Sequence, residues 1–152
     1  MNVTLDTEEM EFAALAGAMR RARALSVGLN DRYGAVDVDP WSIDIEGVAA
    51  ELAVAKALGR YYVPALRVQT EGGDVGSYQV RHTHHQNGCL LIKDGDRDED
   101  YFILVIGHAP SLRVVGWLRA MHGRRPEWRR EVRGRSAFFV PQEALSPIRG
   151  SA

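Results

Sequence analysis

The feature that most constrains the fold of this chain is a continuous apolar run, Tyr101 to Ile106. It follows a polar segment, 94–100, that holds five acidic residues and a glycine. A short apolar run rich in aromatic and β-branched residues, bounded by turn sequence, is typical of a strand buried in the middle of a sheet. We therefore expect this run to be the buried centre of a sheet, and the acidic segment to be a solvated turn.

Two helices are predicted before the strands. Thr7 is followed by Glu8 and Glu9, a favourable helix start, and apolar residues then recur with helical spacing over 7–29. A loop is expected over 30–40. Ser42 is expected to cap a second helix that ends near Leu58, before Gly59.

The remaining sequence predicts short strands and turns. Pro64 indicates that the strand-like segment 61–68 lies at an edge or contains a bulge. The other predicted elements are strands over 77–83, 89–93, 113–118 and 137–140, a short helix opening at Pro126, and a packed tail over 141–148. The predicted fold class is α/β: one domain over 1–152, with a mixed central sheet flanked by the two N-terminal helices.

Composition restricts the class of protein. The chain has 152 residues and a formal net charge of −1, which suit one domain with a real core. Its one cysteine, Cys89, excludes an internal disulfide framework and fits a reducing compartment. No apolar run reaches membrane-spanning length, and the N-terminus reads as an acidic helix rather than a signal peptide. We expect a soluble, cytoplasmic protein with no membrane partner.

The chemistry-bearing residues fall in two neighbouring segments. Glu51 is a lone acid in the alanine-rich sequence of the second helix, where a carboxylate is costly unless it is paired or bound to a metal. Asp74 follows two glycines and precedes a strand on which Gln79 and Arg81 share one face. A carboxylate, an amide oxygen and a cation in this arrangement fit a divalent metal and a phosphate.

These residues resemble the active-site frame of the PD-(D/E)XK nuclease superfamily over residues 43–107. Glu51 resembles the helix acid of that family and Asp74 its metal-binding aspartate. Gln79-Val80-Arg81 stands where the family has Glu-x-Lys. The chain is thus similar to a divergent member, with a restriction-endonuclease-like core. Gln79 keeps one oxygen for a metal but has no charge, and Arg81 keeps the cation but is no general base.

The resemblance implies a metal-dependent nuclease that hydrolyses phosphodiester bonds. Asp74, the Gln79 side-chain oxygen and the Val80 carbonyl would hold Mg²⁺ or Mn²⁺, with Glu51 on the same ion through water or on a second ion. Arg81 would contact the scissile phosphate. Glu46 is the rival helix acid, although a favourable charge in the first helical turn explains it.

An arginine-rich segment follows the predicted core. Eight arginines lie between Arg113 and Arg135, against only Glu127 and Glu131. Such a segment is either a solvated surface or a grip on a phosphate backbone. On the second interpretation the nucleic-acid-binding residues, with DNA as the partner, are Arg113, Arg119, Arg124, Arg125, Arg129 and Arg130.

Two metal patterns are set aside. The histidines of 82–85 with Cys89 and His108 match no standard zinc spacing, so we expect His84 and His85 to be exposed at a strand end. The alternating aspartates of 94–100 lack the glycine and closing glutamate of a calcium loop.

Two alternatives to the nuclease stay open. A catalytically decayed module of the same fold would bind nucleic acid or a protein partner without turnover, since fold does not determine function. An accessory protein of a phage or mobile element would act only on a protein partner. A homodimer is a further possible assembly. Trp117, Trp128, Phe138 and Phe139 are most simply packing residues, but an aromatic ring left exposed beside the arginines would suit base stacking.

Overall fold

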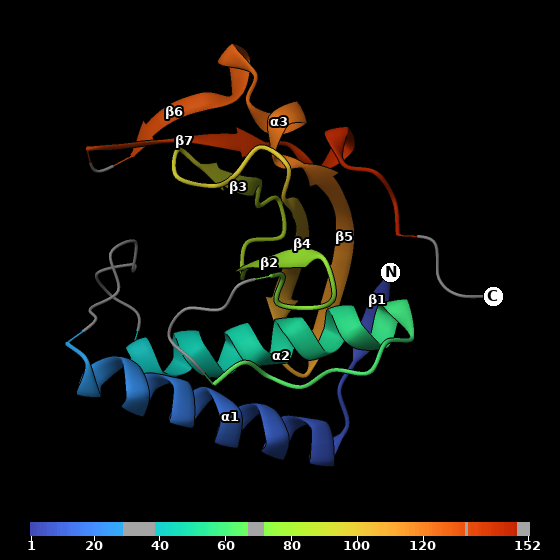
Figure 1. The fold of residues 1–152 in the computed structure, drawn as a ribbon. Helices are drawn as coiled ribbons and strands as arrows, with labels where there is room; N and C mark the ends of the chain where they lie inside the picture. The colour runs from blue at the N-terminus through green and yellow to red at the C-terminus, as the bar shows by residue number, and fades with distance from the viewer. Residues whose placement is uncertain (29–38, 67–71, 133, 149–152) are drawn as a thin grey trace.

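A computed structural model describes residues 1–28, 39–66, 72–132 and 134–148. It consists of three layers: a pair of helices, a four-stranded sheet, and a three-stranded sheet on the far side (Figure 1). The described part of the chain is one α/β domain with a mixed sheet, as the sequence predicts. Among the described residues, no helix is long and apolar enough to cross a membrane.

The central run forms the predicted strand. β4 (Tyr101–His108) lies between β5 (Ser111–Arg119) and β2 (Tyr78–Thr83), with β1 (Asn2–Thr4) on the outer side of β5. β2 pairs with β4 in parallel, and the other two pairings are antiparallel. All residues of β4 from 102 to 107 are buried. This strand is therefore the buried centre of the mixed sheet.

The two faces of β4 enter different cores. Ile103 and Val105 are fully buried in the core under the helices, whereas Phe102, Leu104 and Ile106 belong to a second core. The second core is closed by a sheet of order β3 (Leu90–Lys93), β7 (Arg135–Val140), β6 (Arg129–Val132). Strand alternation explains this division, because successive side chains point to opposite faces.

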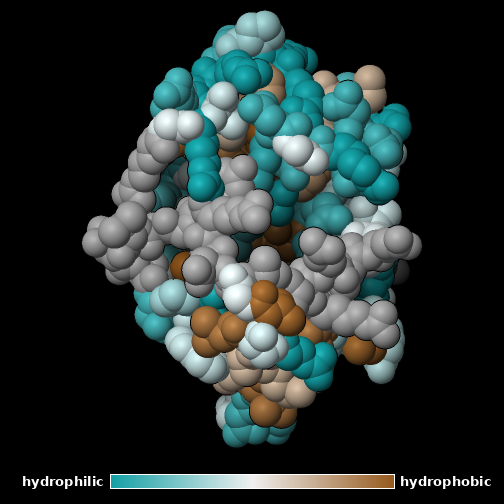
Figure 2. All heavy atoms as spheres, turned by 60° about the vertical axis from the view of Figure 1, so that its left-hand side comes forward, coloured by the Kyte–Doolittle hydropathy of each residue, from teal (hydrophilic) through white to brown (hydrophobic). Residues whose placement is uncertain are grey.

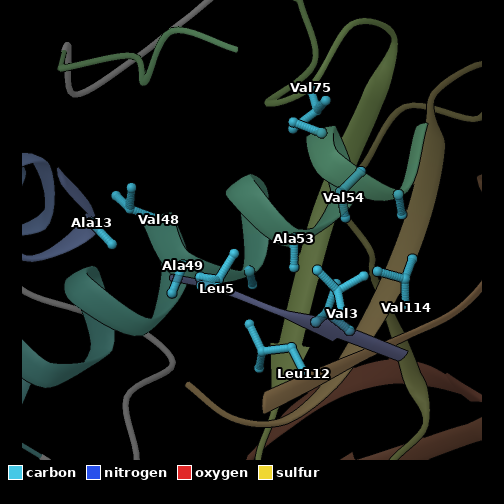
Figure 3. Close-up of a cluster of buried hydrophobic side chains, with 14 of the residues drawn as sticks. Val3, Leu5, Ala13, Val48, Ala49, Ala53, Val54, Val75, Leu112 and Val114 are labelled. Atoms are coloured by element: carbon cyan, nitrogen blue, oxygen red, sulfur yellow. The ribbon is translucent and has the colours of Figure 1, made fainter. Parts of the chain in front are cut away.

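The helices stack on one side of the sheet. α2 (Pro40–Leu58) packs on the sheet through small side chains such as Ala49 and Ala53, and α1 (Thr7–Ser26) lies on the outer side of α2 (Figures 1 and 3). The two N-terminal helices therefore flank the mixed sheet, as the sequence predicts. Both helices lie on the same side, because the C-terminal strands carry their own apolar residues and cover the other face.

The N-cap of each helix lies before the predicted capping residue. Asp6, not Thr7, is the N-cap of α1 and forms a capping box with Glu9. Asp39, not Ser42, is the N-cap of α2: its carboxylate accepts the Ser42 N–H, and a proline follows in the first turn. In each case an aspartate one residue before the helix accepts a backbone N–H of the first turn. The hydroxyl residues predicted as caps, Thr7 and Ser42, therefore lie inside the helices. α1 ends at Ser26 with Val27 as its C-cap, earlier than the predicted end at residue 29. Most of the predicted loop over 30–40 lies outside the described residues.

The predicted strands form with one exception. Residues 61–66 are not a strand, and positions 67 and 68 lie outside the described residues. The other strands form within two residues of their predicted ends. Ser146 in the tail pairs with Trp117 of β5, so the tail packs as expected. The short helical elements are α3 (Ala120–Gly123), η1 (Pro126–Trp128) and η2 (Gln142–Ala144).

The surface differs between the layers. Figure 2 shows mostly hydrophilic residues over the upper part, where the three-stranded sheet lies, and hydrophobic residues gathered below. On α1 the exposed hydrophobic side chains are Phe12, Leu15, Met19 and Leu25.

Candidate functional site

Glu51 lies at the middle of α2 and is only 6% exposed. Arg20 of α1 donates two hydrogen bonds to it, of 2.6 and 2.7 Å, one to each carboxylate oxygen. The hydroxyl of Tyr62 also donates to Glu51. The carboxylate that the sequence singles out is thus paired and buried between the two helices.

The contact with Glu51 shifts the pKa values of Arg20 and Tyr62. Burial and then the Glu51 carboxylate raise the pKa of Tyr62. Burial alone lowers the pKa of Arg20, but the hydrogen bond and charge of Glu51 outweigh it and raise that pKa. Both donors are therefore held in the protonated form that Glu51 needs, which makes the cluster a closed buried ion pair.

Asp74 lies in the turn before β2. Its Oδ2 accepts the Val80 N–H at 2.7 Å. Because β2 is an edge strand, this bond caps a backbone group at the open side of the sheet. Burial and then the Glu51 carboxylate raise the pKa of Asp74, against lowering contributions from the Val80 hydrogen bond, Arg81 and Arg20. Two of the predicted site carboxylates are therefore electrostatic neighbours.

Gln79 and Arg81 lie on the other face of the sheet. In the β2–β4 register they stand beside Phe102 and Leu104, which belong to the core under the second sheet. Val80 between them packs against the core on the helical side. The four predicted catalytic residues thus meet around one strand edge, but they do not converge on one face.

Both of these side chains have partners. Gln79 donates to the Gly72 carbonyl at 2.8 Å. Arg81 donates to both oxygens of Asp96, at 2.9 and 3.1 Å, and its guanidinium lies over the Phe102 ring. A hollow of about 620 Å³ beside them is lined by Gly72, Gln79, Gly95, Asp96, Arg97, Asp100 and Phe102.

The residues do not fit the Mg²⁺ or Mn²⁺ site that the resemblance implies. Both oxygens of Glu51 accept hydrogen bonds from Arg20, and Tyr62 donates to it as well. Gln79 and Glu51 lie on opposite sides of the sheet. A hard cation needs several oxygens around one point. Of the predicted ligands, only Asp74 and the Val80 carbonyl are left beside each other, and we derive no catalytic step through a metal there.

The acidic turn 94–100 binds arginines. Besides the Arg81–Asp96 pair, Asp98 pairs with Arg124 at 2.7 Å, and Asp94 lies 3.4 Å from Arg129. The turn is a solvated connection between β3 and β4, as the sequence predicts, and its carboxylates neutralise part of the arginine-rich segment.

Other arginines surround an aromatic hollow of about 750 Å³. Tyr101, Trp117 and Trp128 supply aromatic walls, and Arg119 and Arg125 supply cations. Its complete lining is Tyr101, Trp117, Leu118, Arg119, His122, Arg125, Trp128, Ala144 and Ser146. The Arg125 guanidinium lies 4.8 Å from the Trp128 ring centre. A second hollow, of about 430 Å³, shares Trp117 and Ser146 with the first. We call the two together the aromatic groove.

The two other predicted nucleic-acid residues lie outside this groove. Arg113 donates to the Gln142 side chain at 2.9 Å. Arg130 lies over the Phe139 ring on the surface of the three-stranded sheet. The predicted arginine set is therefore spread over several sites, of which the aromatic groove takes Arg119 and Arg125.

A cluster of histidines lies at the end of β2 that faces α2. His82 in β2 and His84, one residue beyond its end, both lie about 4 Å from Glu46 of α2. His108 stacks on His84 with ring centres 4.0 Å apart. Burial lowers the pKa of His82, although the Gly107 carbonyl and Glu46 oppose the shift. The prediction that His84 and His85 are exposed is confirmed for His85, whereas the His84 side chain is only about two-fifths exposed.

Sequence reasoning missed three groups of partners. Arg20 and Tyr62 carry no signal that connects them with Glu51, because they lie far from it in the chain. Glu46 was missed because a favourable charge in the first helical turn already explains an acid at that position. The alternate spacing of His82 and His84 does place them on one face, and that signal could have linked them to a helix packed on the same side.

Comparison of the chain with protein-family models, with curated proteins and with solved structures finds no match. The function therefore has to be argued from these sites.

Proposed function

We propose that this chain is a nucleic-acid-binding module that holds unpaired bases in the aromatic groove and does not cleave its ligand. The observation that carries the proposal is the pairing of aromatic walls with cations in one hollow. Bases stack on aromatic rings regardless of sequence, and arginines beside them suit the phosphates that link the bases.

The residues of the groove support this assignment individually. Arg125 is exposed, and Trp128 beside it is partly exposed, so both are open to a ligand. The Nε of Arg119 is shielded and has no hydrogen-bond partner among the described residues. Because the two hollows adjoin at Trp117, the groove has room for more than one base. A single-stranded ligand fits better than a duplex, whose bases are already stacked on one another.

The alternative is the metal-dependent nuclease with a restriction-endonuclease-like core. The proximity of Asp74 and Glu51 is what favours it. The ion pair of Glu51 with Arg20, and the position of Gln79 on the opposite face, argue for a site that has lost turnover. Binding without cleavage is therefore the better-supported function.

The test is fluorescence anisotropy with labelled single-stranded and duplex DNA and RNA, in Mg²⁺, Mn²⁺ and EDTA, with each sample then run on a denaturing gel. We expect binding of single strands that survives EDTA and leaves the ligand intact. Trp128→Leu keeps apolar packing but removes the stacking face, and it should weaken binding about fivefold or more. Arg125→Ala should also weaken it.

Arg23→Ala is the matched control, because it removes one arginine from the exposed surface of α1. Its affinity should equal that of the wild type. Cleavage that requires Mg²⁺ or Mn²⁺ and disappears with Asp74→Ala would establish the nuclease instead. Absence of binding to every ligand, or equal losses in Arg23→Ala and Arg125→Ala, would reject the groove.

A further inference from the structure

We propose that Glu46, His82 and His84 form a binding site for a divalent transition metal, with Zn²⁺ as the best-fitting ion. The site lies between the N-terminal half of α2 and the end of β2, on the helical side of the sheet. It is separate from the aromatic groove and from the Asp74–Glu51 pair.

The geometry places three ligands around one point. One ring nitrogen from each histidine and one carboxylate oxygen of Glu46 lie within 4.8 Å of one another. The Nε2 atoms of His82 and His84 lie 4.0 and 3.9 Å from oxygens of Glu46. Zinc–ligand bonds of about 2.0–2.1 Å at tetrahedral angles put neighbouring ligand atoms about 3.4 Å apart. Side-chain rotations that bring the ligand atoms up to about 1.4 Å closer together would close the site.

A second observation points to a ligand. The Nε2 of His84 is shielded from solvent and has no hydrogen-bond partner among the described residues. A shielded nitrogen without a partner is costly, and a bound cation would satisfy it. The His84 side chain as a whole is 39% exposed.

The surroundings hold two of the ligands in place. The Ala109 N–H donates to Glu46 Oε2 at 3.3 Å. The Nε2 of His82 lies 2.9 Å from the Gly107 carbonyl, which fixes the orientation of the ring. Metal binding through that nitrogen exchanges this hydrogen bond for a metal bond. The Ala109 hydrogen bond can persist, and bonds of this kind commonly orient a ligating carboxylate.

The donor set selects the class of metal. Two imidazoles and one carboxylate suit Zn²⁺ and related transition metals, whereas Mg²⁺ and Ca²⁺ prefer oxygen ligands. Three protein ligands leave a fourth position of a tetrahedral ion for water or an added ligand, the composition of open zinc sites.

The test is isothermal titration of the chelator-treated full chain with ZnCl₂, supported by the visible absorption of Co²⁺ in the same site. We expect one Zn²⁺ per chain, tetrahedral Co²⁺ bands, and no competition from millimolar Mg²⁺. Glu46→Gln and His84→Ala should each weaken zinc binding about tenfold or more. His85→Ala is the matched control, because this neighbouring histidine is exposed and lies outside the cluster.

Circular dichroism would confirm that each variant is folded. If His84→Ala does not fold, Glu46→Gln decides the result, because it keeps the shape of the side chain. No zinc binding by the wild type would overturn the proposal. So would zinc affinity that is unchanged in Glu46→Gln and His84→Ala, or lost equally in His85→Ala.

Discussion

At the scale of single residues, buried charged side chains in the helical layer are paired with side chains of opposite charge. Arg20 compensates Glu51 inside the helical layer, and Arg21 lies 2.6 Å from Asp44 nearby. Asp74 differs from these groups, because the Val80 N–H and more distant arginines do not fully offset its burial and the charge of Glu51. The ionised form of Asp74 is therefore under electrostatic strain in the folded chain.

We predict that Asp74→Asn stabilises the protein at neutral pH. The pKa of Asp74 is raised on folding, so the native state binds more protons than the unfolded state. The free energy of unfolding then falls as pH rises from the ordinary aspartate value of about 3.8 through the raised one. Asparagine resembles the protonated acid and can still accept the Val80 N–H, so it removes this loss.

Thermal unfolding in EDTA between pH 4 and 8 is the measurement. The variant should unfold at a higher temperature than the wild type at pH 7–8, and the difference should shrink toward pH 4. A gain of about 1 kcal/mol corresponds to about 2–4 °C for a chain of this size. A variant that is less stable at every pH would mean that Arg20, Arg81 and Val80 more than compensate the carboxylate.

At the scale of elements, the contact between the two helices depends on one small residue. A Cβ added to Gly17 of α1 would lie 2.5 Å from the Cα of Ile45 in α2. The close approach also brings Arg21 to Asp44 and to the Pro40 carbonyl. Gly17 is therefore a packing residue, although in sequence it only weakens a helix.

We predict that Gly17→Ala destabilises the protein by about 1–3 kcal/mol, the usual cost of overpacking, despite the better helix propensity of alanine. Gly47→Ala is the matched control in α2, because an added Cβ there meets nothing within 4 Å. The control should be stabilised by about 0.4–1 kcal/mol. Urea unfolding of both variants measures the difference, and a stabilised Gly17→Ala would show that the helices separate without cost.

Prediction from sequence succeeded where the signal is local. The run 101–106 needs only its own residues to be identified as a central strand, and it forms that strand. The second sheet was not predicted, because pairing of Leu90 with Val140 is a contact across 50 residues that leaves no local pattern. The candidate site divides for the same reason: alternation places Gln79 and Arg81 on one face, but it does not say which face meets α2.

At the scale of the whole molecule, charge is distributed by layer and partly cancelled. The formal net charge is −1, yet the arginine-rich segment surrounds the three-stranded sheet and the aromatic groove. Arg124 and Arg129 are paired with carboxylates of the 94–100 turn. Not every arginine of this segment is therefore available to contact a phosphate backbone.

The salt dependence of nucleic-acid binding should reveal this difference. Each neutralised phosphate of a single strand contributes about 0.7 to the slope of log affinity against log salt. We predict that Arg119→Ala/Arg125→Ala flattens the slope by up to about 1.4, because these side chains line the groove. The charge-neutral variant Arg129→Ala/Asp94→Ala should leave it unchanged, because it removes an arginine together with its carboxylate. Anisotropy titrations from 50 to 300 mM KCl measure both slopes. A flatter slope for the second variant and not for the first would place the phosphate contacts on the three-stranded sheet rather than at the groove.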